Sequence, residues 1–428
     1  MKGISPLFHC CEKIPSHLYS NGAVEPPWNP CNLHSLKGLT AMVIAQELAM
    51  KFSIAQTELF QALQVVSSAV PSRTTLPVLS NILVEAEKDF VRLTATDLDL
   101  AISTRARANV SEPGSLTVPA KKLFELVRKL PKEELRVDAK ELNLTVGSKS
   151  GRFRFLCIRT DDFPLTPAVS AEATITIGHE AMDHLIRRTI YSVSTDETRP
   201  ALNGALFQVK DGELRVVATD GHRLAKATCR PEQPLAHGPR NDIIIPLKAL
   251  NQLARLLPAA AGPVEIVLSK NHARFNLGDT TLTTKLIEGP FPNYEQVIPK
   301  QNNKHLRAKR EDLAAALERV SVFSDSLTRQ VKLSLRENKL TLIVQTPDQG
   351  EATEDLPAQY TSEDLDIGYN ATYLLDILRT VETEEVEMQL NTPVTAGLLV
   401  PVAGGEANAG AKAVEELLCL VMPLRLAG

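Results

Sequence analysis

The chain has 428 residues, of which 43% are hydrophobic, 23% charged and only 4% aromatic, a composition typical of globular proteins with room for several hydrophobic cores. No apolar run approaches the length of a membrane span, and the length predicts roughly two to four domains. The formal net charge of -4 argues against a simple cationic protein that coats DNA, although net charge does not report how charge is distributed.

The first 49 residues differ from the rest of the chain. They contain the single tryptophan, Trp28, and three of the six cysteines. A secretory signal is excluded because no basic segment precedes a long apolar core. A metal site is conceivable but matches no standard zinc spacing; it would comprise His9, Cys10, Cys11, Cys31 and His34. We interpret residues 1–49 as the result of a start codon assigned too early, with the true start at Met50. The alternative is that they form a disordered tail.

From Met50 onward, one arrangement repeats three times at intervals of roughly 125 residues, the size of one domain. Each copy has an opening helix, a pair of strands and a second helix. We expect the opening helices at residues 57–70, 180–193 and 311–324, the strand pairs at 82–102, 205–225 and 331–350, and the second helices at 118–131, 245–258 and 367–381. The repeats predict three domains, at residues 50–170, 171–300 and 301–428. An Ala/Gly-rich stretch at 403–413 is expected to be a flexible loop before the last strand.

Six helices laid on sheets, with the helices on one side, define an α+β architecture. The helices carry many cations, namely Lys121, Lys122, Arg128, Arg187, Arg188, Lys248, Arg255, Lys309, Arg310, Arg319 and Arg379. A solvated helix face explains any one of them. Taken together, they predict a basic concave face that contacts phosphate groups and reads no bases.

Two short stretches stand out as a candidate docking surface. Residues 216–224, VVATDGHRL, have the pattern of a strand that breaks into a tight turn at Asp220 and Gly221. Residues 420–426, LVMPLRL, have the pattern of an apolar strand with a proline inside it, which strands tolerate mainly at an edge or a bulge. An edge strand beside such a turn would suit a bound peptide, whereas the simpler interpretation is an ordinary exit from a strand. The cysteines outside the first 49 residues, Cys157, Cys229 and Cys419, indicate buried free thiols in a reducing cytoplasm.

From Met50 onward, the sequence resembles the bacterial DNA sliding clamp, the beta subunit of the replicative DNA polymerase III. The resemblance rests on MKF, TLPVLSN, TATDLDL, TVPAKKLFEL, DETRPALNG, ATDGHRLA, EGPFPNY, IGYNATYLLD and the terminal VMPLRL, which span all three repeats. It implies three clamp domains per chain and a head-to-tail homodimeric ring with helices lining the hole and sheets outside. It also implies a cytoplasmic processivity factor that is not an enzyme, has no cofactor or metal and has no membrane association. The implied partners are duplex DNA, a second copy of the chain, the alpha subunit of the replicative polymerase, the clamp loader and repair proteins that carry a clamp-binding motif.

The resemblance also implies roles for individual residues. A pocket for partner peptides would comprise Leu202, Thr219, Gly221, His222, Arg223, Leu224, Pro292, Val297, Asn370, Tyr373, Val394, Met422, Pro423, Leu424 and Arg425. The residues expected to contact duplex DNA are Arg73, Arg199 and Lys248. The dimer would pair edge strands of the first and third domains, with Arg154 and Phe155 on one side and Val322 and Phe323 on the other. Core packing remains the alternative for Leu202 and Val394.

The sequence departs from the family in several places. Ala427 and Gly428 follow the leucine at which family chains usually stop, and the stretch at 403–413 is an insertion. Gln296 and Thr328 stand where a cation and an aromatic residue are expected, so partner preference is expected to differ.

Two alternatives accompany the clamp interpretation. One is a diverged clamp paralogue that serves repair or antibiotic tolerance. The other is an enzyme that uses Asp97, Asp220 and His222. Because the two aspartates hold equivalent positions in different repeats, we expect them to lie too far apart to act as a pair.

Overall fold

The computed structural model describes residues 49–167, 169–230, 242–402 and 416–426. All of them belong to one compact unit, Glu47–Gly428. The predictions for the first 48 residues, for the stretch at 403–413, and for Ala427 and Gly428 fall outside the described residues. No helix in the described part of the chain is long and apolar enough to cross a membrane.

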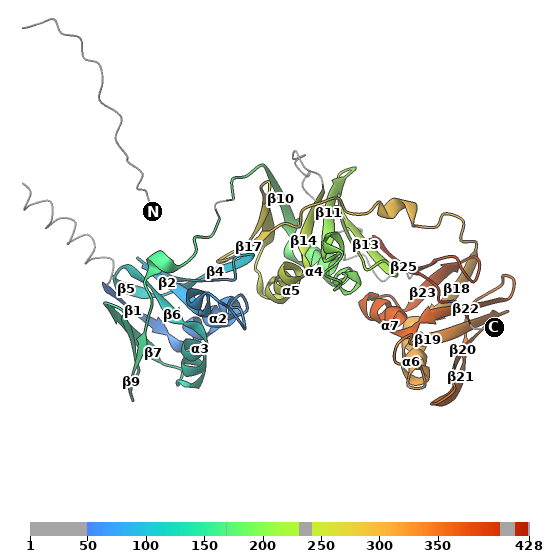
Figure 1. The fold of residues 1–428 in the computed structure, drawn as a ribbon, viewed down its shortest axis with the longest axis horizontal. Coiled ribbons are helices and arrows are strands. Elements are labelled where there is room, and N and C mark those ends of the chain that lie inside the picture. Colours follow the sequence, from blue (N-terminus) through green and yellow to red (C-terminus); the bar gives the residue numbers. More distant parts are fainter. Residues whose placement is uncertain (1–48, 168, 231–241, 403–415, 427–428) are drawn as a thin grey trace, which may run out of the picture. The chain divides into compact units, whose positions relative to one another are not determined.

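The described residues form three successive modules, each with two α-helices, as the repeats predict (Figure 1). The first comprises β1 (Ala49–Ala55), α2 (Gln56–Ser67), β2 (Asn81–Glu87), β3 (Phe90–Thr96), β4 (Leu100–Arg107), β5 (Asn109–Glu112), β6 (Gly114–Pro119), α3 (Ala120–Lys129), β7 (Glu134–Lys140), β8 (Asn143–Gly147) and β9 (Arg152–Leu156).

Among the described residues, the second and third modules follow the same order of elements but have four strands between their two helices where the first has five. The second comprises β10 (Ala173–Gly178), α4 (His179–Arg187), β11 (Gly204–Lys210), β12 (Glu213–Thr219), β13 (Arg223–Cys229), β14 (Asp242–Pro246), α5 (Leu247–Leu256), β15 (Pro263–Leu268), β16 (His272–Leu277) and β17 (Thr280–Lys285). The third comprises β18 (Lys304–Lys309), α6 (Arg310–Ser321), β19 (Gln330–Arg336), β20 (Lys339–Thr346), β21 (Gly350–Pro357), β22 (Leu365–Asn370), α7 (Ala371–Thr380), β23 (Glu385–Leu390), β24 (Gly397–Pro401) and β25 (Glu416–Val421).

Antiparallel pairing joins the modules into continuous sheets. One 8-stranded sheet has the order β10-β15-β16-β17-β4-β3-β2-β6, so β17 of the second module pairs with β4 of the first. The other 8-stranded sheet, β14-β11-β12-β13-β25-β24-β23-β18, pairs β13 of the second module with β25 of the third. Smaller sheets complete the outer modules, with the orders β5-β1-β7-β8-β9 and β21-β20-β19-β22.

The helices lie in adjacent pairs and bury one face each against the sheets (Figure 1). In α3 the buried face consists of Ala120, Leu123 and Val127, spaced three or four residues apart as an amphipathic helix requires. The rings of Phe60 and Phe124 stack with centroids 5.5 Å apart and join α2 to α3. The opening helix of the second module is shorter than predicted, because the chain leaves α4 after Arg187 and residues Ile190–Ser192 form a separate 3-10 turn.

The predicted edge position of the last strand is wrong. β25 ends at Val421, before Pro423, and it is paired on both sides, by β13 and by β24. Pro423 has no N–H to donate to either neighbour, so the ladder stops before it. The chain then crosses to β22, where the Leu424 backbone N–H donates to the Gly368 carbonyl at 2.8 Å.

Candidate functional site

The turn between β12 and β13 is built by local hydrogen bonds. One carboxylate oxygen of Asp220, Oδ1, accepts the backbone N–H groups of His222 at 2.8 Å and Arg223 at 2.9 Å. The Thr219 hydroxyl donates to the Arg223 carbonyl at 2.7 Å and closes the turn. Gly221 has φ +92°, and a Cβ added there would lie 2.9 Å from the Arg199 guanidinium. Glycine therefore adopts this turn without strain, whereas a side chain here would be strained and would displace the Arg199 guanidinium.

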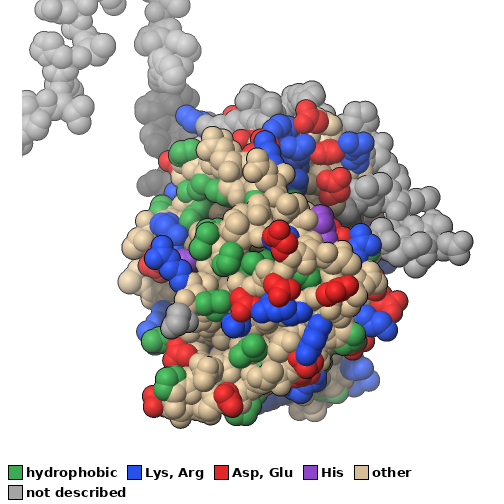
Figure 2. All heavy atoms as spheres, turned by 90° about the vertical axis from the view of Figure 1, so that its right-hand side faces the viewer, with side chains coloured by type: hydrophobic (Ala, Val, Ile, Leu, Met, Phe, Trp, Pro, Cys, Tyr) green, Lys and Arg blue, Asp and Glu red, His purple; other side chains and the backbone are tan. Residues whose placement is uncertain are grey.

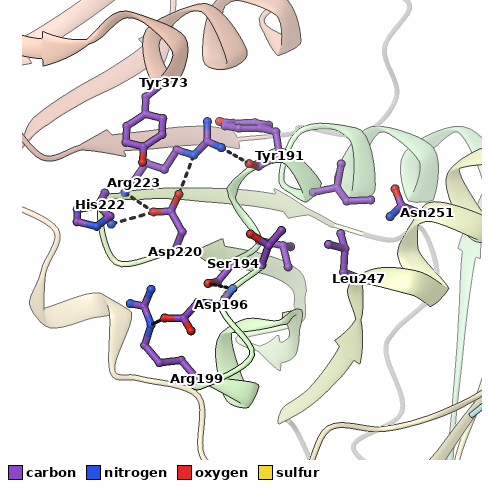
Figure 3. Close-up of a pocket in the computed structure, with 13 residues that line it drawn as sticks. Tyr191, Ser194, Asp196, Arg199, Asp220, His222, Arg223, Leu247, Asn251 and Tyr373 are labelled. Atoms are coloured by element: carbon purple, nitrogen blue, oxygen red, sulfur yellow. Dashed lines mark hydrogen bonds and ion pairs between the residues drawn. The ribbon is translucent and has the colours of Figure 1, made fainter. Parts of the chain in front are cut away.

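The Arg223 side chain connects the second module to the third (Figure 3). Its Nε donates to Asp220 Oδ2 at 3.1 Å and its Nη2 to the Tyr191 carbonyl at 2.6 Å, both in the second module. Its Nη1 donates to Asp376 Oδ2 on α7 of the third module at 2.7 Å. The guanidinium also lies 4.4 Å from the ring centroid of Tyr373, on the same helix. With 11% of its side chain exposed, Arg223 is held within the fold and has little surface left for a partner.

A cavity of about 600 Å³ adjoins this turn. Figure 3 shows His222 and Tyr373 on one side of it and Leu247 and Asn251 of α5 on the other. The remaining lining residues are Ile190, Tyr191, Val193, Ser194, Thr195, Asp196, Arg199, Asp220 and Arg223. Its walls therefore come from both modules and mix aromatic, aliphatic and charged groups, a composition suited to a peptide with apolar anchors.

Eleven of the fifteen residues predicted for the peptide pocket fall into three groups. Three of them line the cavity, namely His222, Arg223 and Tyr373. A second group is buried or structural: Leu202 and Leu224 are 8% and 2% exposed, Thr219 and Gly221 form the turn, and the Asn370 side chain caps α7 by accepting the Thr372 N–H at 2.9 Å. The third group lies at the surface and comprises Val297, Val394 and Met422, which are 56%, 71% and 43% exposed.

The end of the chain lies beside the turn. The Met422 backbone N–H donates to the His222 carbonyl at 2.8 Å, so the exposed Met422 side chain starts from the backbone next to the cavity residue His222. Pro423 and Leu424 are half-buried, Arg425 is exposed, and the Arg425 carbonyl accepts a hydrogen bond from Gln330 at 3.2 Å. Pro292 is exposed in the connection that leads to the third module, where Gln296 ends a 3-10 turn. Thr328 is exposed in the loop after α6.

Tyr191 links the cavity to the last strand. Its hydroxyl lies 3.1 Å from the thiol of Cys419 in β25. Burial raises the pKa of Tyr191 well above its usual value and raises the pKa of Cys419 to about 12, so both groups stay neutral at physiological pH. Cys157, Cys229 and Cys419 are buried, as the sequence predicts, and none of them forms a disulfide within the described residues.

Acidic neighbours hold two of the three cations predicted to contact DNA. Arg199 donates from Nε to Asp196 at 2.9 Å, and Lys248, the second residue of α5, forms an ion pair with Asp97 of the first module. Burial lowers the pKa of Lys248. Arg73 is exposed and forms no ion pair with the rest of the described chain. Asp97 and Asp220 bind different cations, Lys248 and Arg223 respectively.

Six of the eleven cations on the predicted basic helix face are paired with acidic side chains. Of its cations, Arg187, Arg188, Lys248, Arg310, Arg319 and Arg379 form ion pairs with Asp183, Glu382, Asp97, Glu311, Glu354 and Glu318 respectively. On the face shown in Figure 2, basic and acidic side chains also lie interspersed. Among the described residues, no group of three or more His, Cys, Asp or Glu side chains could hold a metal ion. The predicted cluster of His9, Cys10, Cys11, Cys31 and His34 lies outside them.

The four residues predicted for the dimer interface lie in two places. Arg154 and Phe155 are on β9, an edge strand, with Phe155 turned into the core at 8% exposure. The edge-strand prediction is wrong for Val322 and Phe323. They directly follow α6, which ends at Ser321, within the range 311–324 predicted for the opening helix. They are 74% and 37% exposed, and the Phe323 ring lies against Gly350 at the start of β21, an edge strand of its sheet.

Comparison with known proteins follows the three modules. The chain matches the N-terminal, central and C-terminal domains of the DNA polymerase III beta subunit at residues 50–167, 176–293 and 295–409. It is 35% identical to the beta sliding clamp of Pseudomonas putida over 380 residues and to that of Escherichia coli K12 over 379 residues, in each case across 88% of this chain and 100% of the relative. A crystal structure of the Pseudomonas aeruginosa sliding clamp bound to griselimycin is similar with a TM-score of 0.82 at 34% identity, covering 88% of this chain and 100% of that one.

Proposed function

The chain belongs to the beta sliding clamps, the beta subunits of DNA polymerase III, and we propose that it binds partner peptides beside the turn at Asp220. Membership of this family makes it a processivity factor, a non-catalytic subunit whose ring encircles DNA, rather than a diverged paralogue or an enzyme. The observation that carries this function is the succession of three clamp domains along one chain.

A ring acts by topology. Once closed around duplex DNA it leaves only at a DNA end or by opening, so its contacts with phosphate can be weak and salt-sensitive and still keep it mobile. A polymerase tethered to the ring rebinds intramolecularly, at an effective concentration of about millimolar for a short flexible link. A net charge of -4 is compatible with this mechanism because the hold on DNA does not depend on a strongly basic surface.

The peptide site combines the cavity with exposed apolar side chains. The cavity offers Tyr373 and His222 as walls, and Val297, Val394 and Met422 present apolar surface to solvent. Apolar anchors with a few orienting polar groups are what a short linear peptide needs for recognition. The partners we assign to this site are the polymerase alpha subunit, the clamp loader and repair proteins with a clamp-binding motif, all in the cytoplasm.

For DNA, the proposed contacts are Arg73, Arg199 and Lys248, and the other cations on the helices add weak, non-specific attraction to phosphate.

For the ring, we assign the interface to the exposed edge of β9 in one chain and to the surface formed by Val322, Phe323 and β21 in the other. Unpaired edge strands gain hydrogen bonds when a second chain adds to them, and head-to-tail contacts close a ring when the rotation fits. The working domain limits are 50–170, 171–300 and 301–428.

The test loads the protein with its clamp loader onto nicked circular plasmid, linearises half the sample and measures the protein that stays bound. We expect retention on circles and loss after linearisation. Equal retention on both forms would contradict a closed ring and indicate ordinary groove or phosphate binding. A Lys248→Ala variant serves as a control, because loss of one cation should not release a ring from a circle at physiological salt.

A further inference from the structure

The TATDLDL motif of the first module forms the same turn as the one at Asp220. Asp97 Oδ1 accepts the backbone N–H groups of Asp99 at 3.1 Å and Leu100 at 2.8 Å. Leu98 occupies the position of Gly221 and has φ +84°, also in the left-handed region. The two turns differ in what the second carboxylate oxygen binds: Asp220 Oδ2 binds Arg223 of its own turn, whereas Asp97 Oδ2 binds Lys248 of the next module.

The Asp97 carboxylate is fixed and the Lys248 ammonium is accessible. The Asp97 side chain is 9% exposed and that of Lys248 is 53% exposed. The junction around the pair is rigid, because β4 and β17 pair through Leu100 and Thr284 and the Lys285 N–H donates to the Asp99 carbonyl at 2.8 Å. The Asp97 carboxylate is therefore a preorganised part of the fold. The Lys248 ammonium can leave it for another anion without any unfolding of the chain.

We propose that Asp97 is a positioning residue that holds the Lys248 ammonium and competes with DNA phosphate for it. The inference rests on the proposed contact between Lys248 and duplex DNA. When DNA phosphate binds, Lys248 exchanges the Asp97 carboxylate for the phosphate. The net gain in attraction is small, because the lysine gives up a carboxylate that is already oriented towards it. The exchange keeps the contact weak, as a ring that slides requires.

The other two proposed DNA contacts differ from Lys248. Arg199 pairs with Asp196, but that aspartate is 40% exposed and therefore a weak competitor. Arg73 has no acidic partner among the described residues. Of the three cations, only Lys248 is paired with a buried carboxylate supplied by the neighbouring module.

The chain provides a matched pair of variants for the test. Asp97→Asn keeps an Oδ1 acceptor for the turn, because asparagine forms the same turn as aspartate, and removes the charge facing Lys248. Asp99→Asn removes the same charge from the same turn at an exposed side chain. Within the described chain, only the backbone of Asp99 is used there, its N–H by Asp97 and its carbonyl by Lys285. Both variants are made in the full-length protein and checked for unchanged oligomeric mass.

The measurement is the affinity for a short linear duplex, by fluorescence anisotropy over a range of salt concentrations. For Asp97→Asn we expect tighter binding and a salt dependence of log K steeper by about 0.9 for each lysine that gains a phosphate. Asp99→Asn should leave the slope unchanged. Equal slopes for the two variants would overturn the inference, and so would a gain that persists in the double variant Asp97→Asn/Lys248→Ala.

The single variant Lys248→Ala separates this inference from the function on which it rests. If Lys248→Ala weakens duplex binding but Asp97→Asn behaves like Asp99→Asn, Lys248 contacts DNA and the role given to Asp97 is wrong. If Lys248→Ala leaves affinity and slope unchanged, Lys248 does not contact DNA, and both the contact and the competition are refuted.

Discussion

Arg223 of the second module and Asp376 of the third are joined by a hydrogen-bonded ion pair, with Nη1 and Oδ2 2.7 Å apart and the side chains 11% and 24% exposed. The same guanidinium is fixed to its own module by Asp220 and by the Tyr191 carbonyl. One side chain thus sets the relation between the turn that carries His222 and the helix that carries Tyr373, which are two walls of the candidate pocket.

Replacing Arg223 should therefore loosen the junction between these modules. Truncating one partner of a buried, hydrogen-bonded charge pair costs on the order of 2–5 kcal/mol, and for Arg223→Ala we expect about 3 kcal/mol. Arg223→Lys should recover little, because the three acceptors are bound by three different nitrogens of the planar guanidinium, and a single ammonium nitrogen cannot occupy all three positions. The measurement is hydrogen exchange of β13 and β25 amides together with peptide affinity. Arg379→Ala is the control: Arg379 lies on α7 with Asp376, 3.7 Å from that carboxylate, but its closer pair is with Glu318 at 3.2 Å. It is 62% exposed and should contribute under about 1 kcal/mol.

The sequence predicts the elements better than the links between them. The helix α3 follows from apolar residues spaced along one face, which is a local property of the chain. The ties made by Arg223 join residues 32 and 153 positions apart, and nothing in the local pattern marks Tyr191 or Asp376 as partners. Pro423 misled the interpretation of the last strand because a proline within an apolar run is consistent with an edge strand and also with a strand that has already ended.

The interface residues show a similar limit. Alternation along β9 marks Phe155 as facing the core, and the structure buries it. Leu156, on the same edge strand as Arg154, is 78% exposed. The motifs that carry the family resemblance did not identify Leu156 as an interface residue. The position of Val322 and Phe323 after α6, beside β21, depends on how the helix packs on its sheet, which the sequence pattern does not specify.

Removal of residues 422–428 should abolish peptide binding and leave the dimer intact. The deletion takes away the exposed Met422 side chain and the contact between Leu424 and Gly368, but it leaves β25, which holds the junction, in place. The affinity of a labelled partner peptide is measured by anisotropy and the mass by native mass spectrometry. Met422→Ala alone should weaken binding, whereas Leu76→Ala, at a comparably exposed leucine in the first module, should not. Unchanged affinity in the deletion variant would refute the pocket.

Replacing Val322 and Phe323 together with alanine should yield monomers. Both side chains are apolar and exposed in the single chain, at 74% and 37%, and burial of such groups at a subunit contact contributes about 1.5–3 kcal/mol for each large side chain. Sedimentation at low protein concentration gives the mass. Leu165→Ala, which removes a 94% exposed leucine outside the proposed interface, should remain dimeric. A dimer that survives dilution in the double variant would place the interface elsewhere.

Glu387 should make the attachment of the edge strand β18 to its neighbour β23 sensitive to acid. This carboxylate on β23 is 8% exposed and accepts hydrogen bonds from Gln389 at 3.0 Å and Arg307 at 2.7 Å, with His305 Nδ1 3.0 Å away. Burial alone would raise the pKa of Glu387, but these neighbours outweigh it and hold the pKa below its usual value of 4.5. Because the pKa is lower in the folded state, the stabilisation is complete above that usual value and is lost as the pH falls through the folded pKa.

Glu387→Gln should therefore reduce hydrogen-exchange protection of β18 at about pH 7, by on the order of 1–3 kcal/mol, and the difference from the unchanged protein should shrink towards about pH 3. Glu385→Gln is the matched control, two residues away on the same strand, because no side-chain ion pair of Glu385 is present within the described residues. Protection in the Glu387 variant equal to that in the control at both pH values would mean that the carboxylate does not hold β18. A difference that grows on acidification would reverse the sign of the linkage, because it would require a folded pKa above the usual value.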